Sequence, residues 1–258
     1  MTKLIAEIGW NHMGDMKLAK EMILAAKESG CDFAKFQTWS VDRLKPGVWD
    51  TDGRREIYEK AELDLDKHFD LKNYCDEIGI GFMSSVFSIQ DAELLSKVTT
   101  DYVKIPSFES RNETLIYHCL KYFGHLLIST GTSTYNEVRV NTKFIDDDRF
   151  TLLHCVSSYP CDFDIVNLPR IDDLKRIQKS VGFSDHTKGV DVSILALGYG
   201  LDFIEKHFTI DNDLPGRDNK FAVLPKELKR LKNNIDIFTK VNKNLGSDYQ
   251  QCELDSRE

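Results

Sequence analysis

Short apolar segments alternate with longer amphipathic segments along the whole chain. Apolar residues recur with helical period in residues 16–29, where Leu18, Met22, Ile23 and Ala26 share one face. Runs rich in β-branched and aromatic residues predict eight buried strands at 4–8, 33–37, 81–84, 102–105, 126–129, 150–155, 181–184 and 203–207. Helical patterns between and after them predict seven further helices at 67–78, 89–98, 112–122, 135–140, 168–179, 190–199 and 225–245.

This order of strand and helix, repeated eight times, is typical of a parallel (β/α)₈ TIM barrel, an α/β fold that needs about 250 residues. A doubly wound open sheet would give a similar order of elements. The chain lacks both GxGxxG after the first strand and GxxxxGK[ST] anywhere, which are the phosphate-binding motifs of the commonest open sheets. We therefore predict one barrel domain over residues 1–258, with 246–258 as a C-terminal tail.

One long segment, residues 38–66, interrupts the alternation after the second predicted strand. It carries Trp39, Trp49, Arg54, Arg55 and Tyr58. A long insertion after a barrel strand lies at the carboxyl-terminal face, where barrel enzymes have their active sites. The segment is therefore either a lid or rim over the mouth of the barrel, or a surface loop without a function of its own.

The negative net charge of the chain argues against two classes of partner, nucleic acids and anionic membranes. The chain has 34 Lys and Arg residues against 42 Asp and Glu residues, a formal net charge of −8, whereas nucleic acids and anionic membranes bind basic surfaces. No apolar run is long enough to cross a membrane, and the first residues lack the pattern of a signal peptide. Six dispersed cysteines without a CxxC pair indicate reduced thiols, so we predict a cytoplasmic protein.

Polar residues collect where the predicted strands end. In a barrel these positions converge on one site, while barrel interiors are otherwise filled with Val, Ile and Leu. The polar residues at the eight strand ends are Glu7, Asn11, His12, Lys35, Gln37, Ser84, Ser85, Lys104, Ser107, Glu109, Ser129, Thr130, Thr132, His154, Ser157, Ser158, Tyr159, Ser184, Asp185, His186, Thr187, Glu205, Lys206 and His207. Such a set predicts a ligand site, because buried charges without a partner are costly.

The residue types indicate which ligands the site would bind. Two lysines, several hydroxyls and the glycine turn at Gly131 suit a small anion carrying phosphate and carboxylate groups. His186 and His207, on neighbouring strand ends, suit a divalent first-row metal ion that stays partly open to water or substrate. We expect His12 and His154 to be hydrogen-bonded core residues instead.

Alternation along the strands separates structural residues from site residues. Lys35 and Gln37 are two positions apart and point to the same side, whereas Lys206 and Asp185 alternate to the outer side and are expected to be structural. The aromatic residues Phe33, Phe82, Phe87 and Phe203 are expected to lie in the core.

Nine short motifs, in order from residue 4 to about residue 230, resemble those of the sialic acid synthase family. They are Ile5-Ala6-Glu7-Ile8-Gly9 with Asn11-His12-Met13-Gly14-Asp15, Lys35-Phe36-Gln37, Lys104-Ile105-Pro106-Ser107, Ser129-Thr130-Gly131, Leu153-His154-Cys155, Tyr159-Pro160, Val166-Asn167-Leu168, Ser184-Asp185-His186-Thr187 and Glu205-Lys206-His207-Phe208-Thr209. Each motif is short, but nine in register are highly specific.

The resemblance implies a transferase that joins phosphoenolpyruvate to an N-acylated aldose such as N-acetylmannosamine, giving a nonulosonic acid and phosphate. It implies a divalent ion on His186 and His207, Mn²⁺ first, with Mg²⁺ or Co²⁺ as alternatives. It implies that Lys35, Ser85, Lys104, Ser107, Ser129, Ser157 and Ser184 hold phosphoenolpyruvate, and that Glu109, Tyr159 and Asp218 meet the sugar. Glu7 matches an active-site carboxylate of the family, and a homodimer is a further expectation.

Three departures from the family pattern bear on the acceptor. The usual Ser-Thr-Pro-Phe at the third strand is Ser84-Ser85-Val86-Phe87 here. The usual Gly-Pro-Asp-His after the eighth strand is Gly216-Arg217-Asp218-Asn219. Many relatives also carry a C-terminal antifreeze-like domain that supplies an arginine to a partner's site. We expect this chain to stop without that domain, so that Arg217 or a separate chain replaces the positive group.

From these residues we predict a site with distinct roles. Lys35 and Lys104 position phosphoenolpyruvate, and either Glu7 or Glu109 handles a proton or steadies a developing cation. Substrate contacts are predicted for Gln37, Ser85, Ser107, Ser129, Ser157, Tyr159, Ser184, Arg217 and Asp218. Three alternatives remain: a related synthase acting on a phosphorylated or non-aminated sugar, a Schiff-base lyase using Lys104, and a non-catalytic sugar-phosphate sensor.

Overall fold

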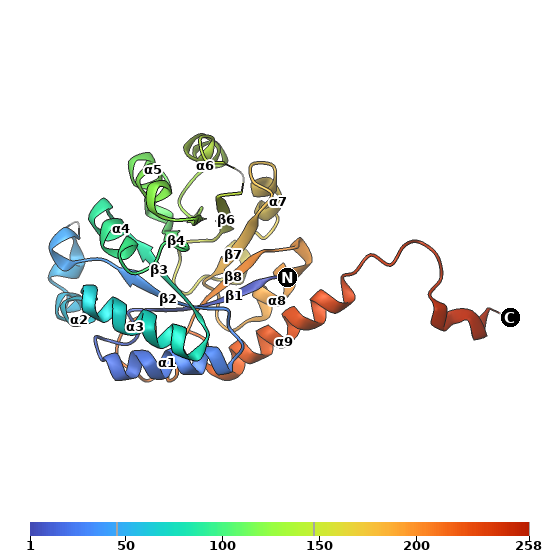
Figure 1. The fold of residues 1–258 in the computed structure, drawn as a ribbon, viewed down its shortest axis with the longest axis horizontal. Coiled ribbons are helices and arrows are strands. Elements are labelled where there is room, and N and C mark those ends of the chain that lie inside the picture. Colours follow the sequence, from blue (N-terminus) through green and yellow to red (C-terminus); the bar gives the residue numbers. More distant parts are fainter. Residues whose placement is uncertain (45, 147, 258) are drawn as a thin grey trace.

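The chain folds into a closed barrel of eight parallel strands surrounded by helices (Figure 1). The computed structural model describes residues 1–44, 46–146 and 148–257. Each strand pairs with the next, and β8 closes the barrel on β1. The strands are β1 (Lys3–Gly9), β2 (Phe33–Thr38), β3 (Gly81–Val86), β4 (Tyr102–Ile105), β5 (His125–Ser129), β6 (Phe150–His154), β7 (Val181–Asp185) and β8 (Phe203–His207). The predicted TIM barrel is confirmed, with strand ends within two residues of those expected from the sequence.

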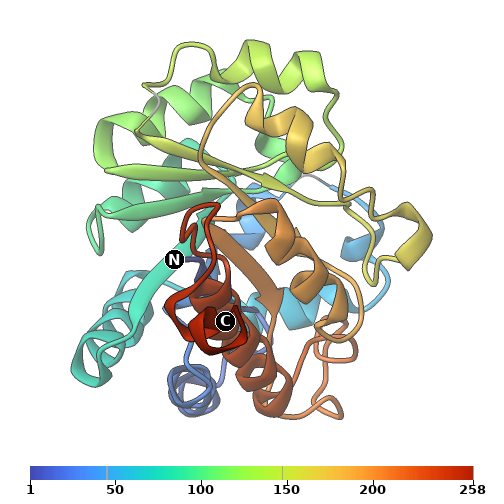
Figure 2. The ribbon, with the colours of Figure 1, turned by 90° about the vertical axis from the view of Figure 1, so that its right-hand side faces the viewer.

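The helices form the outer layer of the barrel (Figure 1). In the described residues they are α1 (Met16–Glu28), α2 (Arg54–Ala61), α3 (Leu65–Ile78), α4 (Ile89–Ser96), α5 (Glu113–Tyr122), α6 (Tyr135–Thr142), α7 (Arg170–Lys175), α8 (Asp191–Ala196) and α9 (Pro225–Val241). None of these helices has both the length and the apolar composition needed to cross a bilayer. The segment after α9 runs away from the barrel to the C-terminal end of the chain (Figures 1 and 2).

Side-chain capping explains several helix ends, and local sequence explains the differences from the pattern. The carboxylate of Asp15 accepts hydrogen bonds from the backbone N–H groups of Lys17 and Leu18 at the start of α1. The helix α8 is shorter than its apolar pattern because the chain tightens into a 3₁₀ turn at Leu197–Tyr199, before Gly200. The pattern does not predict α2, since its sequence RREIYEKA is mostly charged.

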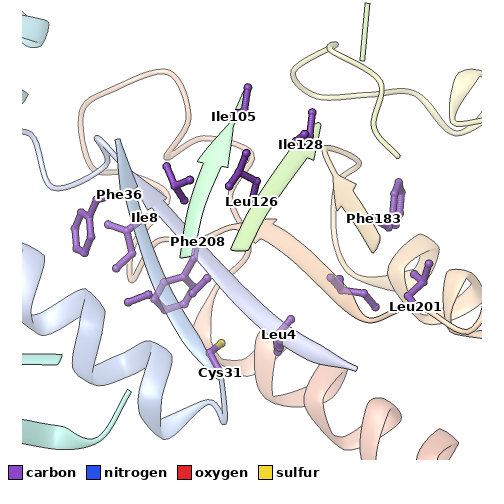
Figure 3. Packing of buried hydrophobic residues seen from close by; sticks show 14 of the residues in the cluster. Leu4, Ile8, Cys31, Phe36, Ile105, Leu126, Ile128, Phe183, Leu201 and Phe208 are labelled. Atoms are coloured by element: carbon purple, nitrogen blue, oxygen red, sulfur yellow. The ribbon is translucent and has the colours of Figure 1, made fainter. Parts of the chain in front are cut away.

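Two hydrophobic regions pack on opposite sides of the strands. The outward-facing residues pack against the helices in one large core, which includes Leu4, Ile8, Phe36, Ile128 and Phe208 (Figure 3). The inward-facing residues near the strand starts form a separate apolar plug inside the barrel. The plug consists of Ile5, Phe33, Met83, Leu127, Leu153 and Phe203.

The inward-facing positions change from apolar to polar toward the strand ends. Two residues after Ile5 and Phe33 come Glu7 and Lys35, and two residues after Phe203 comes Glu205. The side chains of all three polar residues are buried. Because side chains alternate along a strand, the same face that seals the bottom of the barrel presents charged groups at its top.

Candidate active site

A cavity of about 390 Å³ opens where the barrel strands end. Residues from every strand or the loop after it reach the cavity, as expected for the carboxyl-terminal face of a TIM barrel. It is lined by Glu7, Trp10, Lys35, Gln37, Tyr58, Ser85, Phe87, Lys104, Pro106, Ser107, Phe108, Ser129, Tyr159, Ser184, His186, Glu205, His207, Arg217 and Asp218. Thirteen of the fifteen site residues predicted from the sequence line this cavity, and Glu109 and Ser157 do not.

A network of buried charges occupies the base of the cavity. Glu205 Oε1 lies 2.8 Å from Lys104 Nζ, and Glu205 Oε2 lies 3.5 Å from Lys35 Nζ. Lys35 Nζ also lies 2.5 Å from Glu7 Oε2 and donates a hydrogen bond of 2.9 Å to Ser85 Oγ. Gln37 donates to the other oxygen of Glu7 at 2.7 Å. The two lysines are thus held near one another by two carboxylates.

Burial and ion pairing shift the pKa values of these groups in opposite directions. Burial alone would raise the pKa of Glu205, but Lys104 and Lys35 outweigh it and hold that pKa well below its usual range. Burial raises the pKa of Glu7, against the attraction of Lys35. Burial would lower the pKa of Lys35, but Glu205 and Glu7 raise it above its usual value. Lys35 and Glu205 are therefore charged in the folded protein, and Glu7 is the carboxylate better able to hold a proton.

His186 and His207 present imidazole rings to the same cavity from β7 and β8. Their ring centroids are 5.6 Å apart. His186 Nδ1 lies 2.7 Å from the carbonyl oxygen of Val156, so Nδ1 carries the hydrogen and Nε2 keeps its lone pair. Burial lowers the pKa of His186 to about 4, and burial together with His186 lowers that of His207 well below its usual value. Both rings are neutral at physiological pH, the form that binds metals.

The two histidines have the features of a pair of metal ligands. The backbone carbonyl of Val156 orients His186, which is the usual arrangement for a histidine that binds a metal. Nδ1 of His207 is buried and has no hydrogen-bond partner, although Asp218 Oδ2 lies 3.7 Å away. Within the described residues, no three His, Cys, Asp or Glu side chains are placed to hold an ion together. The residues present therefore fit a divalent ion bound by two imidazoles, with its other positions open to water or substrate.

Three residues surround the histidines on the side facing the mouth. The ring of Tyr159 lies 4.2 Å from that of His186, measured between centroids. The indole of Trp10 donates a hydrogen bond to Asp218, but burial raises the pKa of this carboxyl to about 6. Arg217 Nη2 lies 3.5 Å from the carbonyl oxygen of Tyr159. Hydrogen-bond donors and acceptors thus surround the open side of the imidazole pair.

Two hydroxyl groups of the cavity lining and a glycine lie near the ends of β4 and β5. Ser107 Oγ lies 3.0 Å from Cys155 Sγ, and Ser129 is buried beside the cavity. A Cβ atom on Gly131 would lie 2.5 Å from Ser157 Oγ and 2.7 Å from Ser107 Oγ. Glycine is therefore required for the two hydroxyls to approach the turn after β5. Ser157 itself is exposed and does not line the cavity.

The remaining strand-end residues lie away from the cavity. Glu109 follows β4 in the 3₁₀ turn Ser107–Glu109 and lines a neighbouring cavity. His154 Nε2 lies 2.7 Å from the carbonyl oxygen of Val166, on the outer side of the barrel. Lys206 and Asp185 also point outward and form an ion pair of 3.2 Å with each other.

Six residues that line the cavity were not assigned a site role from the sequence: Trp10, Tyr58, Phe87, Pro106, Phe108 and Glu205. Glu205 is the most central, and its position two residues before His207 on β8 was the signal for it. Phe87 was expected in the core but is half-buried and lines the cavity, because it follows the end of β3. Trp10 and Phe108 come from the turns after β1 and β4, and Tyr58 comes from α2; strand alternation does not encode the direction of these segments.

Comparisons with known proteins agree with this geometry. The NeuB family model matches residues 22–248. An N,N'-diacetyllegionaminic acid synthase of Legionella pneumophila is 39% identical over 251 residues, covering 90% of this chain and 70% of that protein. An N-acetylneuraminate-9-phosphate synthase of Drosophila melanogaster is 32% identical over 252 residues, covering 91% and 67%.

A solved structure extends the likeness to three dimensions. The crystal structure of N-acetylneuraminic acid synthetase from Leptospira borgpetersenii serovar Hardjo-bovis, in complex with citrate, has a TM-score of 0.89 to this chain. The two sequences are 29% identical, and the match covers 99% of this chain and 90% of that one. Barrel, strand-end residues and relatives together place this chain in the NeuB family of sialic acid synthases and their homologues.

Proposed function

We propose that this chain condenses phosphoenolpyruvate with an N-acylated aldose to give a nonulosonic acid and phosphate. The family and the names of the similar synthases support this reaction class. The observation that carries the proposal is the meeting of Lys35, Lys104, His186 and His207 in one cavity. Two ammonium groups suit an enol phosphate with a carboxylate, and two neutral imidazoles suit a divalent ion.

The lysines and hydroxyls bind and orient phosphoenolpyruvate in this proposal. Lys35 and Lys104 each contact Glu205, so a bound anion shares the lysines with that carboxylate. Ser85, Ser107, Ser129 and Ser184 offer hydrogen bonds around the same space, and Ser157 stays a predicted ligand. Holding C3 of the enol at attack distance from the aldehyde carbon lowers the entropic part of the barrier.

The condensation forms one carbon–carbon bond and one carbon–oxygen bond from water, and it breaks the carbon–oxygen bond between C2 and phosphate. C3 of phosphoenolpyruvate attacks the aldehyde carbon, water adds at C2, and phosphate leaves from C2. When bound at His186 and His207, a divalent ion supplies polarisation of the aldehyde oxygen; Mn²⁺ is our first choice, with Mg²⁺ or Co²⁺ as alternatives. Tyr159, Asp218 and Arg217 border these histidines and would contact the acceptor.

A carboxylate next to Lys35 would manage the proton. Glu7 reaches the cavity, and its pKa is raised by burial, so as a carboxylate it can take the proton of the water that adds at C2 and pass it to the alkoxide formed from the aldehyde oxygen. Glu109 lines the neighbouring cavity instead. We therefore propose Glu7 for proton transfer and Glu109 for acceptor binding.

The direct test is phosphate release from phosphoenolpyruvate in the presence of N-acylated aldoses. Excess chelator is expected to abolish release, and Mn²⁺ is expected to restore it, because the neutral imidazole pair would then regain its ion. Release that needs no aldose would indicate a phosphatase, and full activity in excess chelator would contradict the use of a metal. Borohydride trapping with pyruvate would label Lys104 only in a Schiff-base lyase.

A further inference from the structure

A buried polar network lies behind the two histidines of the cavity, on the outer side of the barrel. Its members are Asp185 at the end of β7, Thr187, Ser193 in α8 and Lys206 in β8. Each of these four residues is at most 2% exposed. A well-packed apolar pair often fills such a space without loss of stability, so the buried charges need a reason other than packing.

The carboxylate of Asp185 fixes the backbone on both sides of His186. Its Oδ1 accepts hydrogen bonds of 2.8 Å from the backbone N–H and from the hydroxyl of Thr187. Its Oδ2 accepts a hydrogen bond of 2.5 Å from Ser193 and lies 3.2 Å from Lys206 Nζ. Four donors therefore satisfy the two oxygens, and the bonds to Thr187 close a tight turn with His186 at its centre.

Lys206 connects this turn to the neighbouring strand. Its Nζ donates a hydrogen bond of 2.6 Å to the carbonyl oxygen of Thr187. Lys206 directly precedes His207, and Thr187 directly follows His186. One ammonium group therefore joins the two backbone segments that carry the imidazoles.

The network acts where strand pairing ends. The last residue of β7 is Asp185, whose register partner on β8 is Lys206, so His186 lies one residue beyond β7. His207 is still within β8 and is paired in register with Glu7 of β1. The barrel ladder therefore fixes His207, whereas the position of His186 depends on contacts outside the ladder.

Two further contacts hold His186, and both come from the segment after β6. The backbone N–H of Cys161 donates a hydrogen bond of 2.9 Å to the carbonyl oxygen of His186, and the carbonyl oxygen of Val156 lies 2.7 Å from its Nδ1. The bond from Lys206 differs from these because it comes from the strand that carries His207. It therefore bears directly on the separation of the two rings.

We propose that Asp185 and Lys206 are positioning residues of the candidate metal site, which hold His186 at the separation from His207 at which both rings bind one divalent ion. The inference rests on the proposed function, because that function places the ion on these two rings. Neither Asp185 nor Lys206 lines the cavity, so both act through the backbone that they fasten. Replacing residues that orient metal-binding histidines typically weakens metal binding about 10- to 100-fold.

Binding of Mn²⁺ to the complete, metal-free chain tests the inference independently of turnover. Electron paramagnetic resonance measures the free ion and therefore gives Kd. Asp185→Asn keeps the size of the side chain but removes its charge, and it should raise Kd for Mn²⁺ about tenfold or more. Lys206→Met removes the bond to Thr187 and should raise Kd to a similar extent.

Asp91→Asn is the matched control. Asp91 is also 1% exposed and ion-paired, in its case with Arg43. It lies in α4, which follows β3, and β3 is opposite β7 in the closed barrel. The control variant should lose stability but keep the Kd for Mn²⁺ of the unaltered chain. An equal rise of Kd in Asp91→Asn and Asp185→Asn would overturn the inference.

The double variant Asp185→Asn/Lys206→Met separates positioning from stability. It leaves no unpaired charge in the network, so its unfolding temperature should exceed those of the two single variants. Its Kd for Mn²⁺ should stay raised, because the bond to the carbonyl oxygen of Thr187 is still missing. Recovery of Mn²⁺ affinity together with stability would mean that the network serves folding alone. The double variant also decides the question if the single variants fold poorly.

The outcomes separate this inference from the metal site on which it rests. No uptake of Mn²⁺ by the unaltered chain, or uptake that persists in His207→Ala, would remove the proposed metal site and the inference together. Uptake that depends on His207 but has the same Kd in the unaltered chain and in Asp185→Asn and Lys206→Met would overturn the inference alone.

Discussion

At the scale of single residues, Glu205 organises the centre of the cavity. It contacts both lysines and also accepts a hydrogen bond of 2.7 Å from Ser184. A buried carboxylate between two ammonium groups lowers the cost of burying either of them. It also fixes the two positive charges at a set separation, which an anionic substrate would then meet as a preformed site.

Replacing Glu205 by glutamine should therefore damage both stability and turnover. The loss of the charge leaves Lys35 and Lys104 undercompensated, and breaking a buried pair costs about 3–5 kcal/mol in the free energy of unfolding. Displaced lysines should lower kcat/KM about a hundredfold. Urea denaturation and phosphate release measure the two effects.

The control for this variant is Glu21→Gln. Glu21 forms an exposed ion pair of 3.7 Å with Lys17, and such pairs contribute less than about 1 kcal/mol. Equal stability of Glu205→Gln and Glu21→Gln would show that Glu205 is not a structural support of the lysines.

At the scale of elements, the insertion is fastened to the barrel by a close backbone contact. Gly14, in the loop between β1 and α1, has φ +82°, and a Cβ atom there would lie 1.8 Å from the carbonyl oxygen of Lys60 in α2. Only glycine allows this approach. The contact holds α2, and with it Tyr58, over the mouth of the barrel.

The Gly14→Ala substitution should therefore destabilise the protein more than a Gly→Ala substitution at a glycine with a similar backbone conformation. Gly53 is the matched control, because it also has a positive φ (+89°) but no atom lies within 4 Å of its Cβ position. We expect about 1 kcal/mol for Gly53→Ala from backbone strain alone and about 3 kcal/mol or more for Gly14→Ala, where overpacking is added.

Thermal or urea unfolding of the two alanine variants measures the difference. A drop in acceptor affinity specific to Gly14→Ala would follow from displacement of α2. Indistinguishable stabilities would mean that the loop and α2 separate without cost.

At the scale of the whole molecule, buried histidines make stability depend on pH. Burial lowers the pKa of His12, His154 and His186 to about 4 in the folded state. The unfolded chain, with a pKa near 6.5 for each, binds protons first as the pH falls. Their contribution to stability is complete above pH 6.5 and is lost progressively down to about pH 4.

The free energy of unfolding should therefore fall between pH 7 and pH 5. Each of the three histidines should cost about 2 kcal/mol at pH 5. Asp218 and Glu7 act in the opposite sense, since a raised carboxyl pKa adds stability at lower pH, but they are fewer. Urea denaturation in chelator at several pH values tests this, and equal stability at pH 7 and pH 5 would contradict it.

Much of the fold was predictable because its signals are local. Alternation of period two and helical periodicity depend only on neighbouring residues, so eight strands and most helices could be located from the pattern. The same alternation placed Lys35, His186 and His207 on inward-facing positions at strand ends. The mostly charged helix α2 has no such periodicity, and its position depends on Tyr58 packing among three tryptophans.

The sequence by itself determined a barrel whose strand tips carry lysines, hydroxyls and a pair of histidines. Only the tertiary structure decided that Glu205 bridges the lysines, that Glu109 faces a neighbouring cavity, and that the insertion lines that cavity with aromatic rings. The physical reason is the distance along the sequence over which each feature is set. The direction of a side chain on a strand is set by its own backbone, whereas distances between segments far apart in sequence are set by closure of the barrel and by packing of the loops upon it.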